Sequence, residues 1–115
     1  MKLDNELFRK IILKAEEDLP ADLKLNFEIP GVDDEVLQYH YRLIDEAGLM
    51  KFMTTKADDH VSRKPYNLTY NGHLVAEKMR DKKLWKTILQ KIGKNAGSII
   101  TIVEFVISQS GKFPS

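Results

Sequence analysis

The sequence predicts a mixed α+β domain in which helices alternate with the strands of a small antiparallel sheet. Two stretches, 5–18 and 34–46, carry apolar residues at helical spacing. A third stretch, 23–29, alternates apolar and polar residues with a period of two, which is typical of a half-buried strand. Glycine and proline punctuate the chain between these stretches. At 115 residues the chain is long enough to bury one core, so we expect a single domain over 1–115.

The first helix is expected over Asn5–Asp18, after an N-cap at Asp4. Pro20 follows its end, where a helix stop is expected. The strand over 23–29 then ends in the turn at Pro30-Gly31. The apolar stripe of the first helix consists of Leu7, Phe8, Ile11, Ile12 and Ala15.

The second helix is expected over 34–46, capped by Asp33 or Asp34. Gly48 stands where a left-handed residue usually ends a helix. A strand should follow over 49–54, then a polar loop over 55–64 and a returning strand through Tyr66 and Leu68. The side chains expected to be buried together are Leu7, Phe8, Ile11, Leu37, Tyr41, Ile44, Leu49, Leu68 and Leu74.

Thr69 is expected to cap a third helix from Tyr70, with an apolar face of Leu74, Val75 and Met79. The charged run 80–83 predicts a kink or a restart, followed by a second apolar face over 84–92. A last helix is expected over 98–109. It is apolar nearly all round, which favours a homodimer through these residues, although burial within one chain is the alternative.

The expected order of elements is helix, strand, helix, strand, loop, strand and helix. This is the winged-helix arrangement with one helix missing, so we predict a winged-helix-like core over 1–76 and a helical extension over 77–115. Residues 37–49, ending in Ala47-Gly48-Leu49, resemble the recognition helix of bacterial winged-helix regulators. The motif over 68–73 is similar to the Leu-Thr-x-x-Gly motif that closes the wing in such proteins.

Together the two motifs resemble an uncharacterised family of phage and prophage proteins, mostly from low-GC Gram-positive bacteria. The Tyr-His pair at Tyr39-His40, the Thr-x-x-Gly-His motif and a tryptophan near Trp85 also fit that family. The resemblance implies the fold of a domain of unknown function. It implies no activity, because the family has none established.

Charge is segregated along the chain. Residues 1–49 carry a net charge of −6, residues 50–76 carry +2 and residues 77–115 carry +5. A basic half favours an anionic partner such as double-stranded DNA. The helix over 33–47 has a net charge of −4, however, which argues against its approach to phosphates. The candidate nucleic-acid contacts are Gln38, Tyr39, Arg42, Lys56, Arg63, Lys64, Lys82 and Lys83.

Two functions remain open at this point. The first is a nucleic-acid-binding or regulatory winged-helix protein of phage type. The second is a protein–protein interaction module, contacting a host or phage protein and binding no DNA. An enzyme is not expected, because the sequence has no cysteine, no P-loop and no dinucleotide fingerprint. No cofactor is expected, and no metal, because no two histidines are three or four residues apart. Without a membrane-length apolar run or a signal peptide, we expect a cytoplasmic protein that contacts no membrane.

Overall fold

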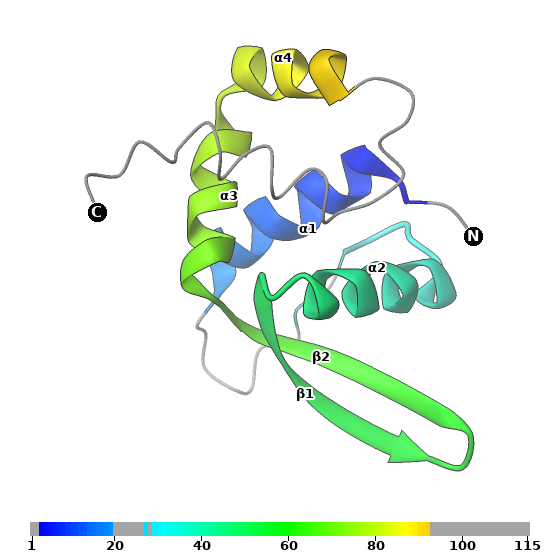
Figure 1. Ribbon diagram of the computed structural model, residues 1–115. Helices are drawn as coiled ribbons and strands as arrows, with labels where there is room; N and C mark the ends of the chain where they lie inside the picture. Colours follow the sequence, from blue (N-terminus) through cyan, green and yellow to red (C-terminus); the bar gives the residue numbers. More distant parts are fainter. Residues whose placement is uncertain (1–2, 20–26, 28, 93–115) are drawn as a thin grey trace.

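The computed structural model is a mixed α+β structure, as predicted (Figure 1). It describes residues 3–19, 27 and 29–92. The expected strand over 23–29 and the expected helix over 98–109 therefore fall wholly or mostly outside the described residues. The described elements are α1 (Asn5–Asp18), α2 (Asp34–Glu46), β1 (Met50–Ala57), β2 (His60–Leu68), α3 (Tyr70–Arg80) and α4 (Lys82–Ile92).

Side-chain caps begin the helices where the sequence predicted them. Asp4 Oδ1 accepts from the backbone N–H groups of Glu6 and Leu7 at 3.0 and 3.1 Å. Asp33 caps α2 by accepting from the Glu35 N–H. Each cap satisfies donors that have no partner inside the helix. The helix bounds at 5–18 and 34–46 are thereby confirmed.

One helix ends and the next begins within the charged residues 80–83, as expected. Asp81 leaves the helical conformation, with ψ at 106°. Its carboxylate then accepts from the Leu84 N–H at 3.1 Å. An aspartate can end one helix and cap the next because its side chain replaces the missing backbone partner. None of the described helices is long and apolar enough to cross a bilayer.

The predicted loop over 55–64 is wrong. Strands β1 and β2 pair antiparallel through this stretch and leave only Asp58 and Asp59 as the turn. Asp58 takes the left-handed conformation, with φ at 54°, which suits a two-residue hairpin turn. The polarity of this stretch was misleading because both faces of the hairpin tip are exposed, so no apolar alternation is required there.

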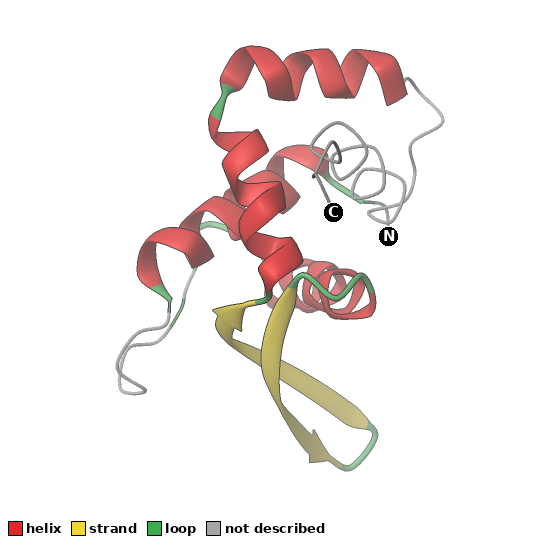
Figure 2. Cartoon of the chain, turned by 60° about the vertical axis from the view of Figure 1, so that its left-hand side comes forward, coloured by secondary structure: helices red, strands yellow, loops and turns green. Residues whose placement is uncertain are grey.

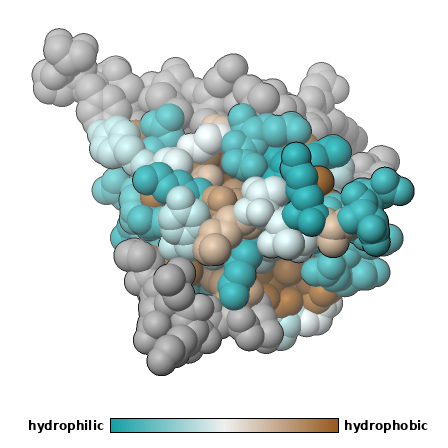
Figure 3. Space-filling model, turned by 90° about the horizontal axis from the view of Figure 1, so that it is seen from below, coloured by the Kyte–Doolittle hydropathy of each residue, from teal (hydrophilic) through white to brown (hydrophobic). Residues whose placement is uncertain are grey.

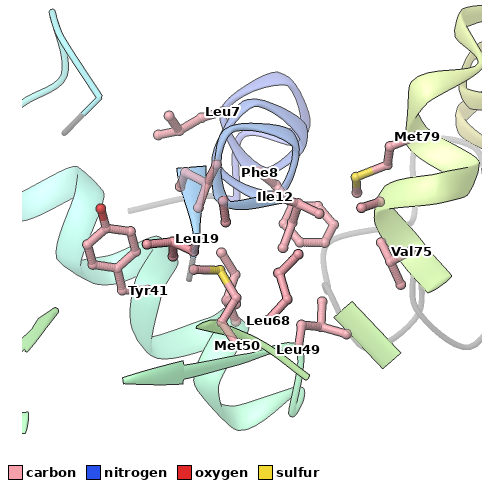
Figure 4. Packing of buried hydrophobic residues seen from close by; sticks show 14 of the residues in the cluster. Leu7, Phe8, Ile12, Leu19, Tyr41, Leu49, Met50, Leu68, Val75 and Met79 are labelled. Atoms are coloured by element: carbon pink, nitrogen blue, oxygen red, sulfur yellow. The ribbon is translucent and has the colours of Figure 1, made fainter. Parts of the chain in front are cut away.

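The core lies between α1, α2, the base of the hairpin and α3 (Figure 4). Phe8, Ile11 and Ile44 are fully buried, and all of the predicted apolar stripe of α1 is in the core. Leu37 is only half-buried, but it packs against this cluster. Leu74 is the error in the predicted core. The buried face of α3 is formed instead by Gly72, Val75, Ala76 and Met79.

The two sequence motifs meet in space at the base of the hairpin. The Thr69 hydroxyl donates to the Gly48 carbonyl at 2.6 Å, and the Thr69 N–H donates to the Leu49 carbonyl at 3.0 Å. Thr69 Oγ1 also accepts from the Gly72 N–H at 3.1 Å. A Cβ on Gly72 would overlap the Leu49 carbonyl oxygen. The motif residues therefore join α3 to the turn after α2, and glycine is required by the close backbone approach.

Candidate functional site

One surface brings together α2 and the hairpin. The hairpin projects from the helical part of the molecule, and α2 lies beside its base (Figures 1 and 2). Residues paired across an antiparallel sheet share a face. The register therefore puts one set of side chains on the face of the hairpin that holds Arg63, here called the inner face. They are Phe52, Thr54, Lys56, Val61, Arg63 and Pro65.

A hollow of about 430 Å³ lies between α2 and the inner face. Its walls combine the ring of Tyr39 and the exposed side chain of Val61 with charged groups of both signs. Seen from below, the molecule shows hydrophilic side chains around a paler and partly hydrophobic middle (Figure 3). The residues that line the hollow are Glu35, Gln38, Tyr39, Arg42, Asp59, Val61 and Arg63.

Gln38 and Arg63 hold the two sides of this surface together. Gln38 Oε1 accepts from the Arg63 N–H at 2.9 Å, and Gln38 Nε2 donates to the Arg63 carbonyl at 3.1 Å. A carboxamide has one carbonyl and one amino group, so it can pair with a strand residue as a neighbouring strand would. Gln38 was predicted to contact nucleic acid. Its amide positions the hairpin, and the nucleic-acid contact stays a prediction.

Both arginines of the hollow have carboxylate partners within the chain. Arg63 Nε lies 3.0 Å from Asp45 Oδ2, and its side chain is only 20% exposed. Arg42 Nε lies 3.8 Å from Glu46 Oε1, and its guanidinium is 5.5 Å from the centre of the Tyr39 ring. These partners reduce the positive potential that a phosphate would meet.

The other predicted contacts do not gather at the hollow. Lys56 shares the inner face and lies near the hairpin tip, next to the turn. Lys64 pairs with Met53 on the opposite, outer face. Lys82 and Lys83 begin α4, which lies at the far end of the molecule from the hairpin tip in both views (Figures 1 and 2). The basic side chains therefore do not converge on one face.

Sequence reasoning missed Asp45 and Val61 as parts of this surface. The sequence counts Asp45 only toward the negative charge of the helix, whereas the structure pairs it with Arg63. Val61 falls in the predicted loop, whereas the structure places it on β2, where it forms an apolar wall of the hollow. Its isolation in a polar stretch was the available signal, because an exposed β-branched residue there gains little unless it packs on something.

The histidines have distinct environments. His40 is fully buried; its Nε2 accepts from the Asp4 N–H at 2.9 Å and its Nδ1 is 2.8 Å from the Val36 carbonyl. Because Nε2 accepts, the ring proton is on Nδ1 and donates to Val36. His60 and His73 are exposed. Within the described ranges, no three histidine or acidic side chains are grouped as a metal site would require.

Similarity to other proteins extends over most of the chain. A family model described as "Hypothetical protein (DUF2513)" matches residues 2–98. An "Uncharacterized protein" of Haemophilus influenzae is 28% identical over 115 residues, covering 95% of this chain and 98% of that protein. No solved structure matches the chain. The similarity points to a family of unknown function, in agreement with the sequence motifs.

Proposed function

This chain belongs to the DUF2513 family of hypothetical proteins, and we propose that it is a small protein-binding module rather than an enzyme. The observation that carries the proposal is the hollow between α2 and the hairpin. Its two arginines are held by carboxylates of α2, its walls include a tyrosine and a valine, and Gln38 fixes its width. Tyrosine and arginine are the residue types that protein interfaces favour.

Charge is the reason for preferring a protein partner. Residues 33–68 carry seven carboxylates and five lysines and arginines. Asp33, Asp34 and Glu35 are all exposed at the start of α2. DNA binding depends largely on neutralising phosphates, and these carboxylates oppose it. A partner with charges of both signs fits this surface better, because each of its charges meets an opposite one.

Duplex DNA is the second candidate. The order of α2, hairpin and α3 supports a winged-helix core, which we propose for this chain together with the phage origin that its motifs predicted. In that arrangement a helix and a wing contact DNA together. Lys56, exposed on the inner face, supports this candidate.

Binding assays on matched variants separate the two candidates. The full chain is immobilised, the proteins it retains are identified, and each is purified and titrated against wild type and variants. Tyr39→Ala and Arg42→Ala change the hollow. Tyr70→Ala is the control, because Tyr70 is 70% exposed outside the hollow. We expect a purified partner whose affinity falls for the hollow variants by about tenfold or more, as for interface anchors, and is unchanged for the control.

Fluorescence anisotropy with a random-sequence duplex at low salt tests the DNA candidate. We expect no salt-dependent binding. If the duplex binds, if the pair Arg63→Ala and Lys64→Ala flattens the salt dependence, and if Asp34→Ala with Glu35→Ala strengthens binding, the DNA function replaces the protein-binding one.

A further inference from the structure

The backbone of β1 offers a row of hydrogen-bonding groups that point away from β2. In an antiparallel pair, residues alternate between those that bond the partner strand and those that face outward. Gln38 bonds the backbone N–H and the carbonyl of Arg63, so these two backbone groups point away from β1. The backbone N–H and carbonyl of its cross-strand partner Thr54 must then point away from β2. By the same alternation, the backbone N–H and carbonyl groups of Phe52 and Lys56 also point away from β2.

Pro65 agrees with this register. It pairs with Phe52, and it has no N–H to donate. Proline is tolerated in a strand where the ladder requires no donor. The two-residue turn also agrees, because the pair that closes it, Ala57 and His60, is normally one that bonds across the strands.

The two edges of the hairpin differ. The β2 edge is covered at Arg63 by the Gln38 carboxamide, whereas no described strand pairs with the other edge of β1. Among the described residues, none bonds the outward backbone groups of Thr54 or Lys56. Both residues are exposed. Unpaired backbone groups on an exposed edge are a template for another strand.

Charge and polarity specify the strand that fits this edge. β1 contains Lys51 and Lys56 and no acidic residue. On the outer face Met53 is 54% exposed and stands opposite Lys64. An extended segment with alternating residues would place carboxylates beside Lys56 and apolar side chains beside Met53. A second copy of this chain is a poorer fit, because its own β1 brings the same two lysines.

We propose that the β1 edge binds an extended acidic segment of a partner protein as a third strand of the sheet. This edge faces away from α2, so the proposal does not rest on the hollow. Backbone hydrogen bonds would supply the attachment, and Lys56 would contact the carboxylates of the segment. Lys51 lies on the outer face with Met53, and its charge adds to that of Lys56 in attracting an acidic segment and opposing self-association.

The test uses the full chain and an acetylated peptide of eight alternating glutamate and valine residues, matching the length of β1. Binding is followed through the amide signals of the ¹⁵N-labelled protein and their exchange rates. We expect slower exchange at Phe52, Thr54 and Lys56, and no slowing at the residues between them, whose N–H groups already bond β2. A lysine–valine peptide should not bind.

Two kinds of variant test the backbone and charge contributions separately. Thr54→Pro removes an outward N–H without removing a bond to β2, and Thr54→Ala is its control because it keeps the N–H. Lys51→Glu with Lys56→Glu reverses the charge, and Lys10→Glu on α1 is its control. We expect Thr54→Pro and the double charge reversal each to weaken the glutamate–valine peptide by about tenfold or more, and both controls to bind as wild type.

Several outcomes would overturn the proposal. They are no binding of the glutamate–valine peptide, equal binding of the lysine–valine peptide, or amide changes outside β1. Displacement of the peptide by random-sequence duplex DNA, with DNA affinity unaffected by Thr54→Pro, would show that the edge attracts polyanions by charge alone. If Thr54→Pro disturbs the hairpin signals, the double charge reversal still decides the question. The Tyr39→Ala variant should bind the peptide normally, so this test is independent of the hollow.

Discussion

Gln38 on α2 and Arg63 on β2 are joined by two hydrogen bonds, at 2.9 and 3.1 Å, in which a side-chain carboxamide pairs with a backbone amide and carbonyl. The pair ties the hairpin to the helix at the point where the candidate surface begins. The Arg63 side chain is held in turn by Asp45. Arg63 is therefore fixed by two side chains of α2: Gln38 bonds its backbone, and Asp45 pairs with its guanidinium.

Replacement of Gln38 tests this attachment. Gln38→Ala loses two partly buried hydrogen bonds, so we expect the free energy of unfolding to fall by about 1–3 kcal/mol. Urea titration measures the loss, and faster exchange of the Arg63 amide locates it. Gln38→Glu should retain the bond from the Arg63 N–H and lose the one to its carbonyl. A loss below about 0.5 kcal/mol for Gln38→Ala, the range of ordinary surface substitutions, would contradict the role given to this residue.

Gly72→Ala should destabilise the protein although alanine is the better helix former. The added Cβ would overlap the Leu49 carbonyl oxygen, and the backbone can relieve this only by moving α3. We expect a loss of about 1–3 kcal/mol, or more if the turn cannot yield. Asn71→Ala, one residue earlier and exposed, is the control and should be neutral or slightly stabilising. A Gly72→Ala protein as stable as wild type would show that the close approach is not maintained in solution.

His40 links the start of α1 to α2. Its Nε2 is the acceptor for the Asp4 N–H, which lies at the N-cap of the helix. His40→Leu leaves that donor without its partner, so we expect a loss of about 1–3 kcal/mol in thermal or chemical unfolding. His73→Ala, at an exposed position, should change stability by less than about 0.5 kcal/mol. Equal losses of stability for the two substitutions would contradict the structural role given to His40.

The buried Tyr41 phenol predicts that the stability of the folded protein falls at alkaline pH. Burial, and secondly the charge of Asp34, raises the pKa of the Tyr41 phenol well above its usual range. The folded state therefore keeps this proton when the unfolded chain releases it. The resulting stabilisation is complete below about pH 10, the ordinary pKa of tyrosine, and is lost as the pH rises further.

Tyr41→Phe should remove that alkaline loss. The Tyr41 hydroxyl is buried with no hydrogen-bond partner in the described part of the chain, so the variant should be at least as stable as wild type at neutral pH. Urea titrations at several pH values compare the two proteins. Tyr70→Phe, at an exposed position, is the control and should follow wild type. A Tyr41→Phe protein that loses stability in parallel with wild type above about pH 10 would refute this effect.

The dimer expected from residues 98–109 stays a prediction. Only Thr101 and Glu104 are polar between Ile99 and Ile107. Ile102→Asp with Phe105→Asp should convert a dimer to a monomer, because a buried unpaired carboxylate is strongly unfavourable. Light scattering of wild type and variant measures this. A wild-type monomer at high concentration would leave the burial of this segment within one chain as the explanation.

Local sequence patterns account for the described helices, their caps and most of the core. Asp4, Asp33 and Thr69 cap the predicted helices, and the stripe from Leu7 to Ala15 is buried as its spacing required. These features follow from local rules, since a cap and an amphipathic period involve residues only a few positions apart. The Ala-Gly-Leu turn and the Thr-x-x-Gly motif also indicated an uncharacterised family, which the match to a family of hypothetical proteins supports.

The hairpin and the candidate surface depend on contacts between segments that are far apart in the sequence. Residues 55–64 lack the apolar–polar alternation that predicts a strand, because their order comes from pairing between β1 and β2 and from the bonds that Gln38 makes to Arg63, 25 residues away. The same holds for charge. Counted along the chain, Arg63 and Lys64 are adjacent cations, but the pleat puts them on opposite faces, and Arg63 pairs with Asp45. Which charges remain available to a partner depends on distances in space, and those are set only when distant segments pack together.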